Sequence, residues 1–73
     1  MAVINEFKEL ALLIKKSRKD QKLTQTQLAI VCGVGLRFIL DVEKGKSTCQ
    51  IGKVLHLIRM LGLDLVIRKR GEK

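Results

Sequence analysis

Residues 24–46 constrain the fold more than any other part of the chain. Thr24 is a good N-cap for a helix, and Gln27, three residues later, can complete a capping box. Gly33 permits the positive φ that a sharp turn needs, so this helix ends there and a second one is expected over residues 35–43. Two helices that cross steeply around a short glycine turn form a helix-turn-helix. The alternative is an αα-hairpin with no role in DNA binding.

Several residues of this segment form a pattern that indicates a protein family only when they are taken together. They are Thr24, Gln25, Leu28, Ala29, Gly33, Val34, Ile39, Glu43, Gly45 and Lys46. Together they resemble the Xre/Cro-type helix-turn-helix domain of phage and bacterial repressors, and the resemblance extends over residues 10–62. With 73 residues, the chain is expected to form a single domain over residues 1–73. The resemblance implies that this domain is mainly α, with a lambda-repressor-like bundle of four to five helices. The ending LGLDLVIRKR resembles that of HipB-type antitoxins, in which a C-terminal strand follows the fifth helix or replaces it.

The formal net charge of +8 limits the choice of partner. An excess of Lys and Arg favours a polyanion: a nucleic acid first, and an anionic membrane surface second. No signal peptide or membrane span is visible, so we expect a protein of the reducing cytoplasm with free thiols at Cys32 and Cys49. Neither these cysteines nor the single His56 has the spacing of metal ligands. With no catalytic constellation either, we expect neither an enzyme nor a cofactor.

A first helix is expected from a cap at Asn5 to about Lys19, because apolar residues recur there at spacings of three and four. Arg18 falls on the core-facing side of this helix, and Glu43 ends the second helix of the motif on its inner side. In the resembled family these two positions form a buried or half-buried ion pair. The alternative is two independent surface charges.

The second helix of the motif would place its N-terminal residues in the major groove. Ile39 and Val42 are expected in the core, which fixes the rotation of this helix. Its outer face then consists of Gly35, Leu36, Arg37, Leu40 and Asp41. The guanidinium of Arg37 can donate to guanine O6 and N7 together, whereas Leu36 and Leu40 can pack on thymine methyl groups. Many repressors of the resembled family carry polar residues here, and the departure leaves open a role for DNA shape.

Phosphate contacts are expected on both sides of this helix. Thr24 and Gln25 present their side chains and amides at the positive end of a helix dipole. Lys44 and Lys46 follow the helix and would flank the other side of the groove. For each lysine, an ordinary solvated charge is an equally good interpretation.

A fourth helix, capped by Ser47 or Thr48, is expected to place one apolar face in the core. That face consists of Ile51, Val54, Leu55, Ile58 and Leu61. Leu57 and Met60 form a second apolar strip beside it. A surface helix does not need that width, so the strip indicates contact with another subunit.

After Gly62, residues 63–68 alternate with a period of two, which is typical of a strand. No other strand is apparent in the sequence, so its partner must come from another molecule. We therefore expect an antiparallel β-ribbon across the axis of a homodimer. Dimerisation would also add burial to a core that is marginal in a domain this small. The side chains expected at this interface are Leu57, Met60, Leu63, Leu65 and Ile67.

The leading hypothesis is a homodimeric, sequence-specific repressor that binds a palindromic double-stranded DNA operator. The HipB resemblance implies more: the antitoxin of a HipBA-like toxin–antitoxin operon, which autoregulates that operon and binds a HipA-type kinase toxin. Two alternatives remain open. One is a stand-alone Xre-family regulator without a toxin, and the other is a basic module that binds RNA or an acidic protein.

Overall fold

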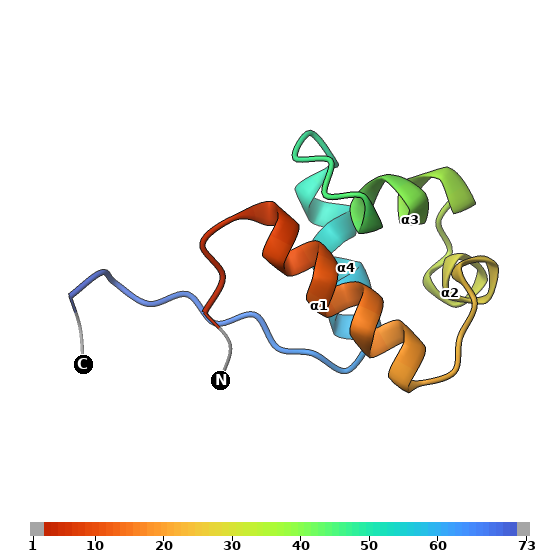
Figure 1. Ribbon diagram of the computed structural model, residues 1–73, viewed down its shortest axis with the longest axis horizontal. Coiled ribbons are helices and arrows are strands. Elements are labelled where there is room, and N and C mark those ends of the chain that lie inside the picture. Colours follow the sequence, from red (N-terminus) through yellow and green to blue (C-terminus); the bar gives the residue numbers. More distant parts are fainter. Residues whose placement is uncertain (1–2, 72–73) are drawn as a thin grey trace.

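Four helices and an extended C-terminal segment make up the protein in a computed structural model that describes residues 3–71. The helices are α1 (Phe7–Asp20), α2 (Gln25–Cys32), α3 (Leu36–Glu43) and α4 (Ile51–Met60). α1 crosses in front of α4, and α2 and α3 lie at one end of the molecule (Figure 1). The C-terminal segment leaves the bundle at the opposite end, so the molecule is elongated, 39 × 25 × 17 Å. The small, mainly α bundle agrees with the expected fold class.

Polar groups satisfy the first amides of α1 and α2. The Thr24 hydroxyl accepts from the Gln27 amide at 3.0 Å and the Gln27 side chain accepts from the Thr24 amide at 2.8 Å, which completes the expected capping box. The expected cap of α1 is wrong, because its N-cap is Glu6 rather than Asn5. There the Glu9 carboxylate, inside the first turn, accepts from the Asn5 amide at 2.6 Å. An acidic group at the positive end of the helix therefore replaces the asparagine cap.

Helix α4 begins later than expected. Its N-cap is Gln50, and neither Ser47 nor Thr48 fills that position. The physical reason is a turn before the helix, in which the Cys49 amide donates to the Lys46 carbonyl at 3.3 Å. The chain must complete this turn before it can take up helical geometry.

The hydrophobic core lies between the helices. Its fully buried side chains are Ile14, Leu28, Ile39, Val42, Val54 and Leu57. The expectation that Leu57 forms an external strip with Met60 is wrong, because Leu57 is completely buried while Ile51 and Leu55 are exposed. Both sets of α4 residues have helical spacing, and the rotation is decided by packing against α2. Leu57 therefore stabilises the monomer and is not available to a second subunit, whereas Met60 is exposed.

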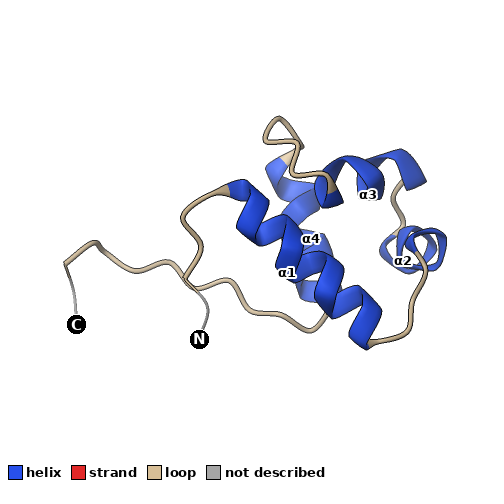
Figure 2. Ribbon diagram, in the orientation of Figure 1, coloured by secondary structure: helices blue, strands red, loops and turns tan. Residues whose placement is uncertain are grey.

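The C-terminal segment after α4 is extended and lies along the bundle only at its start. Gly62 takes a positive φ of 77°, and the Leu63 amide donates to the Ile58 carbonyl at 3.0 Å, which closes the helix end. Leu63 packs partly against the core, but Leu65 and Ile67 are exposed, the latter by 88%. Within residues 3–71 the structure contains no β-strand (Figure 2). The single chain offers residues 63–68 no second strand to pair with.

The chain bends by 117° between α2 and α3. This angle lies within the range of about 90–120° that is typical of a helix-turn-helix. Among the described residues, no single helix is long and apolar enough to cross a membrane; α2 and α3 meet that test only as a pair, across this bend.

Candidate DNA-binding surface

The turn between α2 and α3 sets the direction of α3, so that one face of this helix packs on the core and the other faces solvent. Gly33 takes the left-handed conformation with φ of 68°, and the Val34 amide donates to the Ala29 carbonyl at 3.0 Å. A non-glycine residue at this φ would be strained. Ile39 and Val42 are fully buried, as expected, so the rotation of α3 is fixed and its opposite face is turned toward solvent.

An ion pair ties this arrangement to α1. Arg18 Nε lies 2.7 Å from Glu43 Oε2, and Arg18 Nη2 lies 3.0 Å from Oε1, so the contact is bidentate. Both side chains are almost inaccessible to solvent, 9% and 4% exposed. Arg18 Nη1 also donates to the Leu23 carbonyl at 2.8 Å. The two charges are therefore not independent: they join the end of α1, the start of α2 and the end of α3.

Gln25 belongs to the same network. Its Nε2 donates to Glu43 Oε1 at 3.2 Å, so the amide nitrogen is occupied by the carboxylate that also binds Arg18. Gln25 is half-buried, whereas its neighbour Thr24 is exposed. The second N–H of Gln25 Nε2, the side-chain oxygen and the main-chain amide remain available to a ligand. Sequence reasoning missed this anchoring role because Gln25 and Glu43 are distant in sequence.

The outer face of α3 combines exposed and half-buried groups. Gly35, Leu36 and Arg37 are exposed, while Leu40 and Asp41 are half-buried. Arg37 Nε donates to Asp41 Oδ1 at 3.2 Å. The Arg37 side chain is nonetheless 82% exposed, which leaves the rest of its guanidinium free to meet a ligand.

The loop after α3 supplies further cations. Lys44 and Lys46 are both exposed, and Lys46 Nζ lies 3.7 Å from Asp41 Oδ2. Gly45 between them takes φ of 81°, and its backbone approaches α1 so closely that a Cβ there would lie 3.1 Å from Lys8 Cγ. The loop is therefore held against the bundle. Thr24, before α2, and the two lysines, after α3, are all exposed.

Three contacts that brace the motif were not predicted. Lys53 Nζ of α4 lies 5.8 Å from the centre of the Phe38 ring on α3. One ring nitrogen of His56, Nε2, lies 3.1 Å from the Cys32 carbonyl at the end of α2, and Gln21 Nε2 donates to the Leu61 carbonyl at 2.8 Å. Each contact joins elements that are far apart in sequence, so no local pattern indicates it.

The two thiols are free in the structure. Burial raises the pKa of the Cys32 thiol. Burial also raises the pKa of Cys49, to which the negative charge of Asp41 adds, while Lys46 opposes it. Both groups therefore favour the neutral thiol over the reactive thiolate. Within residues 3–71 no group of three or more His, Cys, Asp or Glu side chains is placed to hold a metal ion.

Comparisons with known proteins identify the family. No family model matches the sequence. The chain is 49% identical over 65 residues to the uncharacterized HTH-type transcriptional regulator y4mF of Sinorhizobium fredii (strain NBRC 101917 / NGR234), covering 89% of this chain and 86% of that protein. The chain belongs to the helix-turn-helix transcriptional regulators. This regulator is also 31% identical to the ImmF control region 10 kDa protein of Bacillus phage phi105, over 89% of its own length and 72% of the phage protein.

Solved structures give the same fold. The regulator superposes with a TM-score of 0.86 on a chain of the HipA-HipB-O2-O3 complex, covering 96% of this chain and 99% of that one. The HipB-O4 20mer complex gives a TM-score of 0.85 over 96% and 99%. Sequence identity is 20% in both cases, so the likeness to these HipB chains concerns the fold.

Proposed function

We propose that this regulator is a sequence-specific, DNA-binding transcriptional repressor. The observation that carries the proposal is the exposed face of α3, held in a fixed orientation by the buried Arg18–Glu43 pair and flanked by exposed cations. A rigid helix with one exposed Arg can enter a major groove without reorganising. The net charge of +8 favours association with the phosphate backbone. The family to which the chain belongs supports the same function.

Each exposed group has a role in this proposal. Arg37 donates to O6 and N7 of a guanine, and Leu36 and Leu40 pack against thymine methyl groups. Thr24 and the amides at the start of α2 bind a phosphate. The backbone contacts on the other side of the groove come from Lys44 and Lys46 together with the loop amides. Gln25 contributes on the same side as Thr24, through its main-chain amide and the side-chain groups that its contact with Glu43 leaves available.

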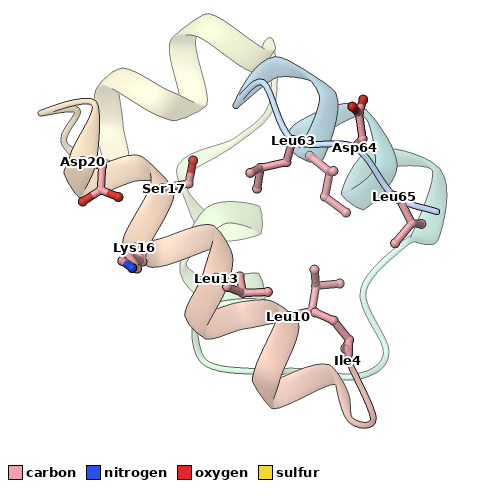
Figure 3. Close-up of a pocket in the computed structure, with 10 residues that line it drawn as sticks. Ile4, Leu10, Leu13, Lys16, Ser17, Asp20, Leu63, Asp64 and Leu65 are labelled. Carbon is pink, nitrogen blue, oxygen red and sulfur yellow. The ribbon is translucent and has the colours of Figure 1, made fainter. Parts of the chain in front are cut away.

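We further propose that the DNA-binding form is a homodimer, joined by an antiparallel ribbon of residues 63–68 about the two-fold axis. An apolar groove supports this. It lies between α1 and the C-terminal segment, with Leu10 and Leu13 of α1 facing Leu63 and Leu65 (Figure 3). A second chain seated here would cover these side chains together with exposed Ile67 and would pair the free backbone of the segment.

The more specific proposal is the antitoxin of a HipBA-like operon, which represses its own promoter through a palindromic operator and binds a HipA-type kinase toxin. The support is the close match of fold to HipB chains solved in complexes that include HipA and operator fragments. A stand-alone regulator shares every feature of the DNA-binding surface. Co-purification of the regulator with the product of a kinase-like gene beside its own separates the two, because a stand-alone regulator would elute alone.

The test of DNA binding is selection from a pool of randomised duplexes of about 30 base pairs, followed by titration of the selected duplex and a scrambled one. A dimer that neutralises roughly 6–8 phosphates should give a log–log salt slope of about −5 to −7. The selected sequence should be palindromic, with half-sites about one helical turn apart. Equal affinity for the scrambled duplex would contradict the proposal and favour a basic module for RNA or an acidic protein.

A further inference from the structure

An acidic side chain, Asp41, lies between Arg37 of α3 and Lys46 of the loop that follows it. We propose that Asp41 is a positioning residue for base recognition, which orients Arg37 toward one base pair and lowers the affinity of the surface for every other sequence. The inference rests on the proposed DNA-binding function and adds a residue that determines its specificity. A carboxylate at this position opposes binding to a polyanion, so its presence on this face calls for a compensating role.

The contacts of Asp41 divide its two oxygens between two cations. Oδ1 accepts from Arg37 Nε at 3.2 Å, and Oδ2 lies 3.7 Å from Lys46 Nζ. The main chain repeats the second link, because the Lys46 amide donates to the Asp41 carbonyl at 3.0 Å. The Asp41 side chain is only 19% exposed, while that of Arg37 is 82% exposed. A fixed carboxylate therefore holds the inner edge of a guanidinium whose outer edge faces solvent.

This geometry suits the recognition of guanine. A guanidinium carries five N–H donors, and a bond at Nε leaves both terminal nitrogens free. Those two nitrogens are the pair that binds O6 and N7 of guanine. Because the Arg37 side chain is ordered before binding, less conformational freedom is lost when the contact forms. Asp41 thus favours the one arrangement in which Arg37 can make a bidentate contact.

The same carboxylate weakens non-specific binding. Without it, Arg37 and Lys46 would present two uncompensated cations that could bind phosphates in many registers. With it, Lys46 has a competing partner 3.7 Å away on the protein. Removal of the charge should therefore act in opposite directions on the two kinds of DNA: weaker preference for the selected base and tighter binding to scrambled duplex.

The experiment uses the full chain with Asp41→Asn, Asp41→Ala and Arg37→Ala, and the double variant Arg37→Ala/Asp41→Asn. The selected duplex, its single-base variants and a scrambled duplex serve as probes. Asp41→Asn should lower the preference at one base pair per half-site by about two- to tenfold, the value of ordering one long side chain. It should raise the affinity for scrambled duplex by about two- to fivefold, as expected for one exposed charge. Glu6→Gln, at the exposed start of α1, removes a charge of the same sign away from α3 and serves as the matched control.

The outcomes separate a positioning role from a structural one. If Asp41 acts through Arg37, the double variant should show the same base preference as Arg37→Ala alone. A merely structural role would lower affinity for both duplexes together and would lower the midpoint of thermal unfolding. Unchanged base preference in Asp41→Asn, with wild-type binding still specific, would overturn the inference and leave the proposed function intact. A wild-type chain that prefers no duplex would overturn the proposed function itself.

Discussion

Residues 24–46 and residues 63–71 differ in how completely one chain pairs their polar groups and buries their apolar side chains. In the first region, capping bonds, the turn at Gly33 and the Arg18–Glu43 pair account for the polar groups that α2 and α3 bury. In the second region, the backbone is extended, and Leu65, Val66 and Ile67 are exposed. The first region is complete within one chain, whereas the second is left unpaired in one chain, and we propose that another molecule pairs with it. The contrast teaches that one small chain can specify the geometry of its binding helix by itself and leave its assembly to a partner.

The largest expected effect is on dimerisation, when the C-terminal segment after Gly62 is removed. Truncation after Gly62 should weaken the dimer by about a hundredfold or more, since burial of Leu65 and Ile67 contributes on the order of 1.5–3 kcal/mol each. Sedimentation measures the dimer dissociation constant directly. Truncation after Lys69 keeps residues 63–68 and is the matched control, which should dimerise normally. An unchanged constant in the shorter chain would show that the segment has no part in assembly.

The stability of the helix-turn-helix, residues 24–46, should depend most strongly on the buried ion pair between Arg18 and Glu43. Arg18→Ala or Glu43→Ala leaves one charge in a site that is nearly inaccessible to water, and should lower the free energy of unfolding by about 3–5 kcal/mol. Arg18→Met combined with Glu43→Leu should cost less than either single change, because no charge is left unpaired. Urea unfolding followed by circular dichroism gives the values. In the cycle formed by Arg18→Met, Glu43→Leu and their double variant, additive effects would mean that the two side chains do not interact.

A smaller and more selective effect is expected at Arg37. Arg37→Ala should cost about 1–3 kcal/mol on the selected duplex and relax the preference at one position per half-site, with no loss of thermal stability. Arg59→Ala, which removes an exposed arginine from α4, controls for net charge. Fluorescence anisotropy on the selected and scrambled duplexes measures both affinities. Equal losses on the two would assign Arg37 to a phosphate instead of a base.

The smallest effect is expected at Lys46. Lys46→Ala should weaken binding to all sequences alike and reduce the magnitude of the salt slope by about 1 for each phosphate that the variant no longer neutralises. Titration of one duplex at several salt concentrations gives the slope. Lys15→Ala, on the exposed side of α1, is the control and should leave the slope nearly unchanged. A change in base preference without a change in slope would place Lys46 at a base edge.

The sequence predicted those features that depend on local chemistry or on one clear face. Thr24 with Gln27, the turn at Gly33, and the burial of Ile39 and Val42 belong to this group. The interaction of Arg18 with Glu43 was predicted only through the family resemblance, since 25 residues separate them.

The predictions were wrong where the local sequence allowed two nearly equivalent choices of buried helix face or of capping residue. In α4 two apolar strips have helical spacing, and only contact with α2 selects the one that contains Leu57 over the one that contains Leu55. At Asn5 and Thr48 a good capping residue was present, but a neighbouring acidic group or turn shifted the helix start. The contact of Gln25 with Glu43 and that of Lys53 with Phe38 depend on the assembled bundle and have no sequence signal.

The shortness of α3 limits how much sequence information one subunit can extract. Its eight residues span about 12 Å, which is close to the width of the major groove. One bidentate arginine selects one of the four possible base pairs at its position, so two half-sites together accept about one random sequence in sixteen. A genome offers about 10⁶–10⁹ competing sites. On the proposed function, the remaining discrimination comes from the thymine contacts of Leu36 and Leu40, from the deformability of the DNA and from the half-site spacing that the dimer imposes. DNA shape and half-site spacing would then select the binding sites of such a regulator together with its direct base contacts.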